Sequence, residues 1–344
     1  MTFALLQIIV VMSYAAASSL STTPTYHVPS FTVQEIQSGN QDDKLRSILT
    51  TTGLFAIRVP LNDDSRSYNQ NYLLSSLCQC QPNNIPFISN GDSRILADGL
   101  TTRSTIATAS QGLSTPISLP KNDIIKHCNS GEDVYNSLES LRDYVSYASK
   151  ETFIPLLDRL IDTSENQNII IKGQNHSKSI LLSTSNHEKE YTTVDSIVED
   201  ASHLEHFHLY SKEKDVKNDI HRYNEARVID SALDWHSDGG LFLAFIPGTS
   251  CRHNHDHTDN ELNIDESFRI KVPYDENESS SYQEMIASFP QSNNHNKNEI
   301  IVAIMLGAGS EHWLNTPESL KLRATQHTVK MKGGDVRAWY GMSK

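Results

Sequence analysis

The sequence has no cluster of lysine or arginine residues that could follow a phosphate backbone, and its formal net charge is −13. Both features argue against nucleic acid as a partner. After the first residues, no stretch reaches the roughly 20 apolar residues that a membrane-spanning helix needs. We therefore expect no stable membrane span in the mature chain.

Cysteine is also scarce, with four residues at positions 78, 80, 128 and 251. Cys78 and Cys80 are separated by a single residue, so they do not form the CxxC motif of zinc knuckles and thioredoxin-like proteins. An even number of cysteines permits disulfides in an oxidising compartment. Four cysteines allow three pairings, and the sequence does not choose among them.

Residues 1–17 are predicted to be a signal peptide. They are largely apolar, and the small residues Ala15 and Ala17 fit a signal-peptidase site. Glycosylation sequons at Asn175 and Asn277 agree with a route through the secretory pathway. The expected location is lumenal or secreted.

The first half of the mature chain is predicted to be mainly helical. Residues 18–28 are rich in Ser and Thr and are expected to form an N-terminal tail. Within residues 29–194, apolar residues at helical spacing predict a long helix near 132–150. Leu54–Val59 is predicted to be a buried strand, and residues 61–128 show little periodicity.

Residues 195–344 have a different pattern, with short β-prone runs separated by Gly, Pro, Asn and Asp. These runs are His206–Tyr210, Leu241–Ile246, Phe268–Val272, Ile300–Leu306, Thr325–Met331 and Val336–Tyr340. Successive strands without helices between them predict an antiparallel sandwich or barrel. Residues 249–266 and 275–298 are strongly polar and are predicted to be solvated insertions.

A metal site is suggested by His236 and Asp238, which are two residues apart. On a strand this spacing places both side chains on one face. A histidine from a neighbouring strand would complete a set of two histidines and one carboxylate, and such a set leaves coordination positions open for other ligands. His327, which lies in a β-prone run, is the candidate.

A candidate anion-binding residue follows the second histidine. Gly333-Gly334 is predicted to form a hairpin turn, and Arg337 lies on the next β-prone run, ten residues after His327. A paired strand would bring its guanidinium close to the metal pocket. A planar guanidinium can hold a carboxylate with two parallel hydrogen bonds, which suits a dicarboxylate co-substrate.

This order of residues resembles the 2-oxoglutarate- and iron(II)-dependent oxygenases, and in particular their isopenicillin N synthase-like branch. Ile304–Asn315 resembles the stretch that precedes the distal histidine in that branch. The resemblance covers residues 28–60 and 200–342 in separate blocks. The sequence departs from the family at Trp339, where the family usually has a serine.

The resemblance implies a double-stranded β-helix, or jelly roll, over residues 195–344, with the helical N-terminal region against one outer face of the sheet. It also implies that iron(II) is bound by His236, Asp238 and His327, and that the distal carboxylate of 2-oxoglutarate is bound by Arg337. Tyr210 is the candidate to assist Arg337. With O₂, such a dioxygenase would form succinate and CO₂ while oxidising an unidentified small-molecule or peptide substrate.

Two other classes of function stay open. His206-Phe207-His208, followed by Glu213, approximates the ligand pattern of metal-binding cupins. The chain would then be a cupin-like metalloenzyme that does not use 2-oxoglutarate. The other class is a secreted binding protein in which the β core is a non-catalytic scaffold.

Several remaining residues have a simpler interpretation. If iron is bound by the first set, His206 and His208 are expected beside the metal or lining its pocket, together with Trp235 and Thr325. His253, His255 and His257 alternate with polar residues and are interpreted as part of a solvated loop.

Overall fold

The computed structural model describes twelve stretches of the chain, at residues 23–61, 70–78, 92–111, 121–128, 130–165, 193–213, 231–251, 266–274, 281–290, 299–314, 316 and 318–344. The predicted signal peptide, both sequons and the histidines at 253–257 lie outside these residues. Within them, no helix is both long and apolar enough to cross a membrane.

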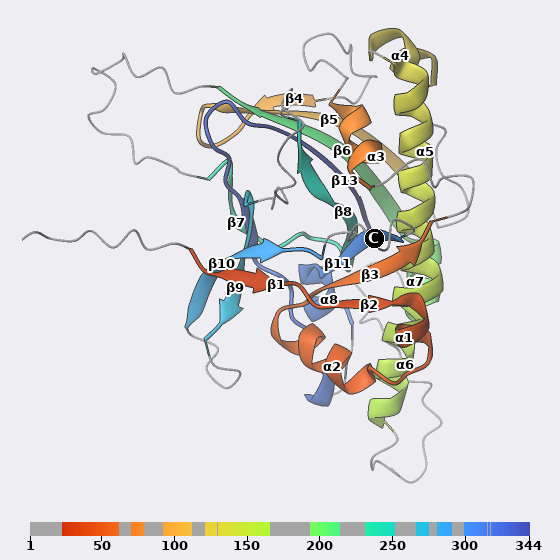
Figure 1. The fold of residues 1–344 in the computed structure, drawn as a ribbon. Coiled ribbons are helices and arrows are strands. Elements are labelled where there is room, and N and C mark those ends of the chain that lie inside the picture. The colour runs from red at the N-terminus through yellow and green to blue at the C-terminus, as the bar shows by residue number, and fades with distance from the viewer. Residues whose placement is uncertain are drawn as a thin grey trace, which may run out of the picture.

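The described strands form two sheets (Figure 1). The smaller has the order β1-β10-β9-β12-β7. Its strands are β1 (Thr25–His27), β10 (Tyr282–Ser288), β9 (Phe268–Pro273), β12 (His327–Val329) and β7 (Leu233–His236).

The larger sheet has the order β2-β3-β11-β8-β13-β6-β5-β4. Its strands are β2 (Ser30–Thr32), β3 (Leu54–Pro60), β11 (Glu299–Leu306), β8 (Phe242–Ser250), β13 (Val336–Ser343), β6 (Ser202–Lys212), β5 (Thr101–Gln111) and β4 (Asp92–Ile95). In both sheets the order has two free ends, so the described strands do not close into a barrel. The mainly β core expected for the second half is confirmed.

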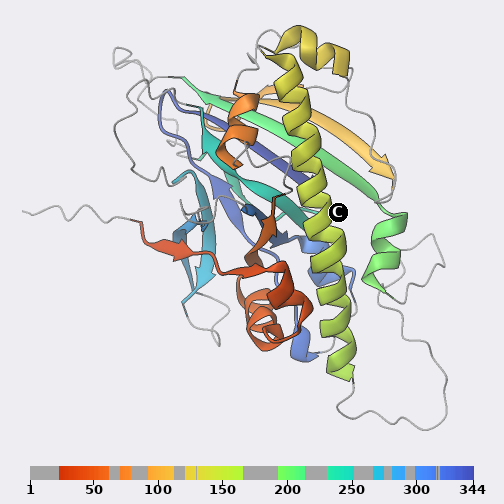
Figure 2. The ribbon, with the colours of Figure 1, turned by 45° about the vertical axis from the view of Figure 1, so that its right-hand side comes forward.

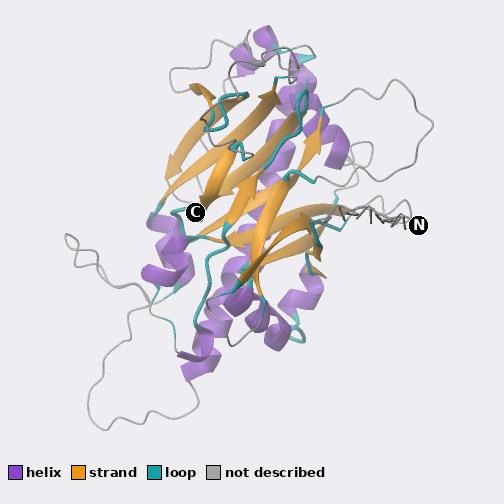
Figure 3. Ribbon diagram, turned by 90° about the vertical axis from the view of Figure 1, so that its left-hand side faces the viewer, coloured by secondary structure: helices purple, strands orange, loops and turns teal. Residues whose placement is uncertain are grey.

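Helices lie against the outer face of the larger sheet (Figures 2 and 3). The described helices are α1 (Val33–Gln37), α2 (Asp42–Thr51), α3 (Gln70–Leu77), α4 (Lys121–His127), α5 (Gly131–Tyr147), η2 (Ala148–Phe153), α6 (Ile154–Glu165), α7 (Val194–Asp200), α8 (Ala308–His312) and η3 (Glu318–Leu320). The longest of them, α5, corresponds to the helix predicted near 132–150. It packs on β8, β11 and β13.

The central strands are apolar throughout because both of their faces are buried. In β11, Ile300, Val302 and Ile304 face the helices, whereas Ile301 and Ala303 face the smaller sheet. Strands β3 and β8 alternate in the same way. The larger sheet is thus the middle layer of the molecule, with one apolar core on each side of it.

Strand β6 uses the same alternation for a different purpose. Its buried residues Glu205 and Phe207 lie under the helices, and Glu205 is bound there by Arg142 of α5. The alternate residues His206, His208 and Tyr210 point to the opposite face, toward the smaller sheet. The predicted run of histidines therefore lines the space between the two sheets.

The N-terminal part was predicted to be mainly helical with a buried strand at Leu54–Val59. That strand is β3, and β1, β2, β4 and β5 add further strands to the two sheets. Part of the expected N-terminal tail is strand β1, and part of the expected insertion at 275–298 is its partner β10. Both strands are only partly buried, and such positions tolerate the polar residues that gave these segments no strand pattern.

The predicted hairpin at Gly333-Gly334 is also not formed. Strand β12 belongs to the smaller sheet and β13 to the larger one, so the turn between them passes from one sheet to the other. Gly334 has φ +81°, a backbone conformation that favours glycine. Its amide donates to the Lys212 carbonyl at the end of β6.

A disulfide joins the helical part to the sheet. Cys78, just after α3, is bonded to Cys251, just after β8, across a sequence separation of 173 residues. Cys128 is also disulfide-bonded. A covalent link between such distant positions restricts the unfolded chain and so favours the folded state.

The Arg142–Glu205 pair gives a prediction about stability. Both side chains are almost fully buried, and Arg142 Nη2 lies 2.7 Å from Glu205 Oε2. Tyr340 of β13 donates a further hydrogen bond to Glu205 at 3.0 Å. Arg142→Met should lower the free energy of unfolding by about 3–5 kcal/mol, because it leaves a buried carboxylate without its cation.

Urea unfolding measures this loss. The double variant Arg142→Met/Glu205→Gln should recover a large part of it, because the amide carries no charge and still accepts from Tyr340. A double variant as unstable as Arg142→Met alone would show that the buried charge is not the cause.

Candidate metal centre and the pocket around it

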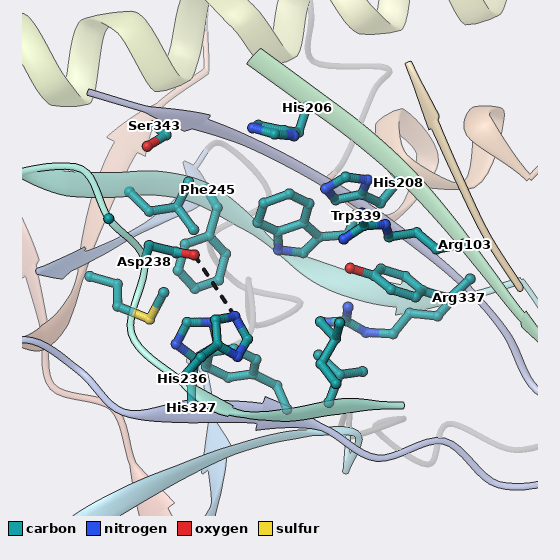
Figure 4. Close-up of a pocket in the computed structure, with 17 residues that line it drawn as sticks. Arg103, His206, His208, His236, Asp238, Phe245, His327, Arg337, Trp339 and Ser343 are labelled. Carbon is teal, nitrogen blue, oxygen red and sulfur yellow. Dashed lines mark ion pairs between the residues drawn. The ribbon is translucent and has the colours of Figure 1, made fainter. Parts of the chain in front are cut away.

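His236, Asp238 and His327 come together at one end of the smaller sheet (Figure 4). Their potential ligand atoms all lie within 4.8 Å of one another, and no other such group of three is found among the described residues. His236 and His327 are direct cross-strand partners on β7 and β12, with ring centroids 4.3 Å apart. The structure therefore places the three predicted ligands close enough to share one metal ion.

Both imidazoles are oriented by backbone carbonyls. Nδ1 of His236 hydrogen-bonds to the carbonyl of Asp234 at 2.7 Å, and Nδ1 of His327 to that of Thr325 at 3.2 Å. A carbonyl only accepts, so Nδ1 carries the proton in each neutral ring and Nε2 keeps its lone pair. The lone pair of His236 Nε2 faces Asp238, whose Oδ1 lies 3.9 Å away. This donor set, two imidazole nitrogens and one carboxylate oxygen, fits a divalent first-row metal.

Strand periodicity was the wrong reason for grouping His236 with Asp238. Strand β7 ends at His236, and Asp238 lies in the turn beyond it. The turn is fixed from outside by residues at the start of α8. Ala308 N–H donates to the Asp238 carbonyl at 2.7 Å, and Gly309 N–H to the Gly240 carbonyl at 3.0 Å.

Gly307 allows this close approach. A Cβ at position 307 would lie 2.2 Å from the Gly240 carbonyl oxygen and 2.9 Å from that of Asp238. Both atoms belong to the backbone and cannot move without moving the turn. The segment Ile304–Asn315, singled out by resemblance, thus contains the backbone that supports the Asp238 turn.

The metal centre opens into a pocket between the two sheets. Its described lining residues are Arg103, His206, His208, Tyr210, Leu233, His236, Asp238, Gly239, Leu243, Phe245, Phe268, Met305, His327, Val329, Arg337, Trp339 and Ser343. The predicted residues His206, His208, Tyr210 and Arg337 are all among them. They stand on the larger sheet, opposite the two histidine ligands.

Two predicted residues are placed differently. Thr325 does not line the pocket; its hydroxyl donates to the Thr52 carbonyl, and its own carbonyl holds His327. It therefore supports a ligand from behind. Trp235 is not in the pocket either, because it alternates with His236 on β7, and Lys271 Nζ lies 4.9 Å from its ring centroid.

Arg337 is buried on the wall that faces the metal centre. Tyr210 is its direct cross-strand partner on β6. The guanidinium lies against Gly248, where a Cβ would come within 2.2 Å of Arg337 Nη2. Glycine at this position therefore provides the space in which the guanidinium lies.

Burial favours the neutral state of three pocket histidines, His327, His206 and His208. Burial lowers the pKa of His327 to about 4, although the nearby Asp238 opposes the shift. Burial also lowers the pKa of His206, and it lowers that of His208 well below its usual value, with Arg103 and Arg337 adding to the effect on His208. Neutral imidazole is the form that binds metal, and the cations of the larger-sheet wall are the two arginines.

The cupin-like ligand set is not assembled in the described structure. His208 Nδ1 is hydrogen-bonded to the Thr105 hydroxyl at 2.8 Å, and its ring stacks on Trp339 with centroids 5.0 Å apart. Glu213 lies beyond the end of β6 and is exposed. His206 and His208 therefore line the pocket wall and belong to no three-ligand group of described residues.

Sequence reasoning missed Arg103 entirely. It lies on β5, within the region of weak periodicity, as the direct cross-strand partner of Tyr210. Its side chain lines the pocket (Figure 4). The run Thr101-Thr102-Arg103-Ser104-Thr105 is rich in threonine, which favours strands. That preference was the available signal, but it does not indicate which strand β5 would join.

Comparison with solved structures finds one with a similar fold. The chain is similar to the crystal structure of a dioxygenase for auxin oxidation from rice, with a TM-score of 0.51 and 9% identity over 92% of this chain and 82% of that one. At this identity the similarity establishes the fold alone.

Two further structures have lower TM-scores. The auxin dioxygenase 1 of Arabidopsis thaliana in complex with 2-oxoglutarate gives a TM-score of 0.44 at 11% identity, covering 92% of this chain and 91% of that one. A full-length Neurospora crassa protein in complex with α-ketoglutarate and 5-formyluracil gives a TM-score of 0.47 at 11% identity, covering 92% of this chain and 83% of that one. No protein-family model matches the sequence, and no curated protein matches it.

The Asp238 turn gives a prediction about metal affinity. Gly307→Ala should weaken binding of a divalent metal by roughly 10- to 100-fold, the cost typical of losing support behind a ligand. All three ligands would still be present, but the new methyl group would displace the turn that carries Asp238.

Gly239→Ala is the matched control, because a Cβ there meets nothing within 4 Å. Calorimetric titration of iron(II) under anaerobic conditions compares the two variants. Equal affinities in Gly307→Ala and Gly239→Ala would contradict the proposed support of Asp238.

Proposed function

We propose that this chain is an iron(II)- and 2-oxoglutarate-dependent oxygenase with a double-stranded β-helix core. One observation carries the proposal. His236, Asp238 and His327 form a possible metal site on one wall of a pocket, and the buried Arg337 faces it from the other wall. A metal site opposite a cation is the arrangement that a chelating dicarboxylate needs.

His236, Asp238 and His327 would be the residues that hold an iron(II) ion beside the pocket. Such a set of two histidines and one carboxylate is typical of non-haem iron oxygenases, because it keeps positions open for co-substrate and O₂. The carbonyls of Asp234 and Thr325 engage Nδ1 of both rings and leave Nε2 available to bind the ion. No rearrangement of tautomers is then required when metal binds.

Arg337 and Tyr210 would hold the distal carboxylate of 2-oxoglutarate. Both side chains are almost fully buried, and a charge-assisted hydrogen bond is stronger where water is excluded. Burial raises the pKa of Tyr210, so its hydroxyl stays protonated and can donate to a carboxylate. Gly248 leaves the space in which the guanidinium lies.

When bound, iron(II) with O₂ and 2-oxoglutarate supplies oxidative decarboxylation of the co-substrate to succinate and CO₂, coupled to oxidation of the substrate. The chain would hold and orient the co-substrate and the substrate in the pocket. Phe245, Phe268 and Met305 form apolar walls beside the ligands. The proposed substrate is a small molecule or a peptide side chain.

A secretory location is a second part of the proposal. It rests on the apolar residues 1–17 with their small residues at the predicted cleavage site, and on the Cys78–Cys251 disulfide, which is typical of oxidising compartments. Mass spectrometry of the protein made in a eukaryotic secretory host checks it. Cleavage after Ala17 is expected, and an intact N-terminus would contradict it.

The first activity prediction concerns the metal ligands. Purified protein with iron(II), ascorbate and 2-oxoglutarate should form succinate. His236→Ala should bind iron more weakly and abolish succinate formation at any co-substrate concentration, because a ligand is lost. His206→Ala should retain iron, because His206 belongs to the opposite wall.

Calorimetry for iron(II) and chromatographic measurement of succinate give both quantities. Iron binding that survives in His236→Ala but is lost in His206→Ala would favour the cupin-like enzyme. Absence of iron binding and of succinate in the wild type would favour the non-catalytic binding protein.

The second activity prediction concerns the co-substrate. Arg337→Ala removes the cation opposite the metal site. It should weaken the binding of 2-oxoglutarate by roughly 30-fold or more, since truncating one partner of a desolvated charge pair costs about 2–5 kcal/mol. Gly248→Ala should weaken it as well, because the methyl group displaces a guanidinium that is still present.

Iron affinity should stay unchanged in both variants, which separates this effect from damage to the metal centre. Steady-state succinate formation as a function of 2-oxoglutarate concentration gives the apparent affinities. An unaltered affinity in Arg337→Ala, with an unchanged circular dichroism spectrum, would remove the main reason for choosing this co-substrate.

A further inference from the structure

Three residues form a row across the pocket wall of the larger sheet. Arg103 on β5 is directly opposite Tyr210 on β6, and Tyr210 is directly opposite Arg337 on β13. Direct cross-strand neighbours lie on the same face with Cβ atoms roughly 4.5–5.5 Å apart. The two arginines therefore flank one tyrosine.

The side chains of these three residues also interact with one another. Arg103 hydrogen-bonds to the Tyr210 side chain, and the positive charges of Arg337 and Arg103 both act on that hydroxyl. Nε of Arg103 is buried and has no hydrogen-bond partner among the described residues. Figure 4 shows both arginines on the same side of the pocket, across from Asp238.

Arg103 and Arg337 place two positive charges on the same wall, one on each side of Tyr210, and a bound anion would offset the repulsion between them. Asp238 is the one acidic residue among the described residues that line the pocket, and it stands with the metal ligands. The neutral His208, next along β6, adds no third charge. The wall is thus strongly suited to an anion that enters from the pocket.

We infer that Arg103 is a second cation of the co-substrate site, and that Arg103 and Arg337 together hold the distal carboxylate of 2-oxoglutarate with the Tyr210 hydroxyl between them. A carboxylate has two oxygens and about four lone-pair sites, which is enough to accept from two guanidinium groups and a phenol. This inference rests on the proposed function. It assigns a role in co-substrate binding to a residue of the N-terminal region.

The test measures binding rather than turnover. The full chain is loaded with manganese(II) in place of iron(II) and titrated by calorimetry with 2-oxoglutarate and with 2-oxopentanoate. The second compound has the same keto-acid end but lacks the distal carboxylate. Arg103→Met should lower the affinity for 2-oxoglutarate by roughly tenfold or more, which is the cost of losing a hydrogen bond to a charged group. The affinity for 2-oxopentanoate should stay within about twofold of the wild-type value, because that ligand has no distal carboxylate for Arg103 to bind.

Two more variants separate this role from a structural one. Arg103→Lys keeps the charge and should recover part of the 2-oxoglutarate affinity. Arg94→Met removes an exposed arginine that is the direct partner of Arg103 on β4 and is not a pocket residue. Its affinity for both compounds should equal that of the wild type.

The outcomes distinguish the inference from the proposed function. If Arg337→Met weakens 2-oxoglutarate and Arg103→Met does not, the inference fails and the function stands. Equal losses for both compounds in Arg103→Met would also overturn it, because the effect would not involve the distal carboxylate. If the manganese-loaded wild type binds neither compound, the proposed function fails and the inference fails with it.

Discussion

The pairing of β12 with β7 is the interaction on which the candidate site depends. It places His327 beside His236, and each ring is then held by the carbonyl of the residue two positions earlier in the chain. An irregularity in the pairing sets two residues of β7, Asp234 and Trp235, against one of β12, Thr328, so that both Leu233 and His236 face the pocket. Asp238 completes the group from the turn beyond the strand.

The two sheets divide the space between them into a core and a pocket. On β3, β8 and β11 the inner face is apolar and packs against the smaller sheet. On β5, β6 and β13 the same face carries Arg103, His208 and Arg337. Burying such groups costs free energy that the apolar core on the outer face must offset, which is typical of a site kept for binding.

The sequence predicted what depends on local pattern and little of what depends on pairing. The apolar strands and α5 follow from periodicity, because burial on one or two faces imposes it. The three predicted ligands do lie together, but for Asp238 the reason given was wrong, since it lies past the end of β7. Arg337 reaches the pocket from the opposite sheet and not through a hairpin, and Arg103 was missed because polar β5 has no apolar pattern.

The central claim is that one pocket has two binding sites on opposite walls. A metal is bound by two histidines and an aspartate on one wall, and a dicarboxylate is bound against the other. Its most direct test is a crystal structure of the protein with manganese(II) and 2-oxoglutarate, with anomalous diffraction measured on both sides of the manganese absorption edge. The account predicts an anomalous peak bound by Nε2 of His236, Nε2 of His327 and a carboxylate oxygen of Asp238, with the distal carboxylate of 2-oxoglutarate at Arg337. A peak at other residues, or 2-oxoglutarate bound away from Arg337, would contradict it.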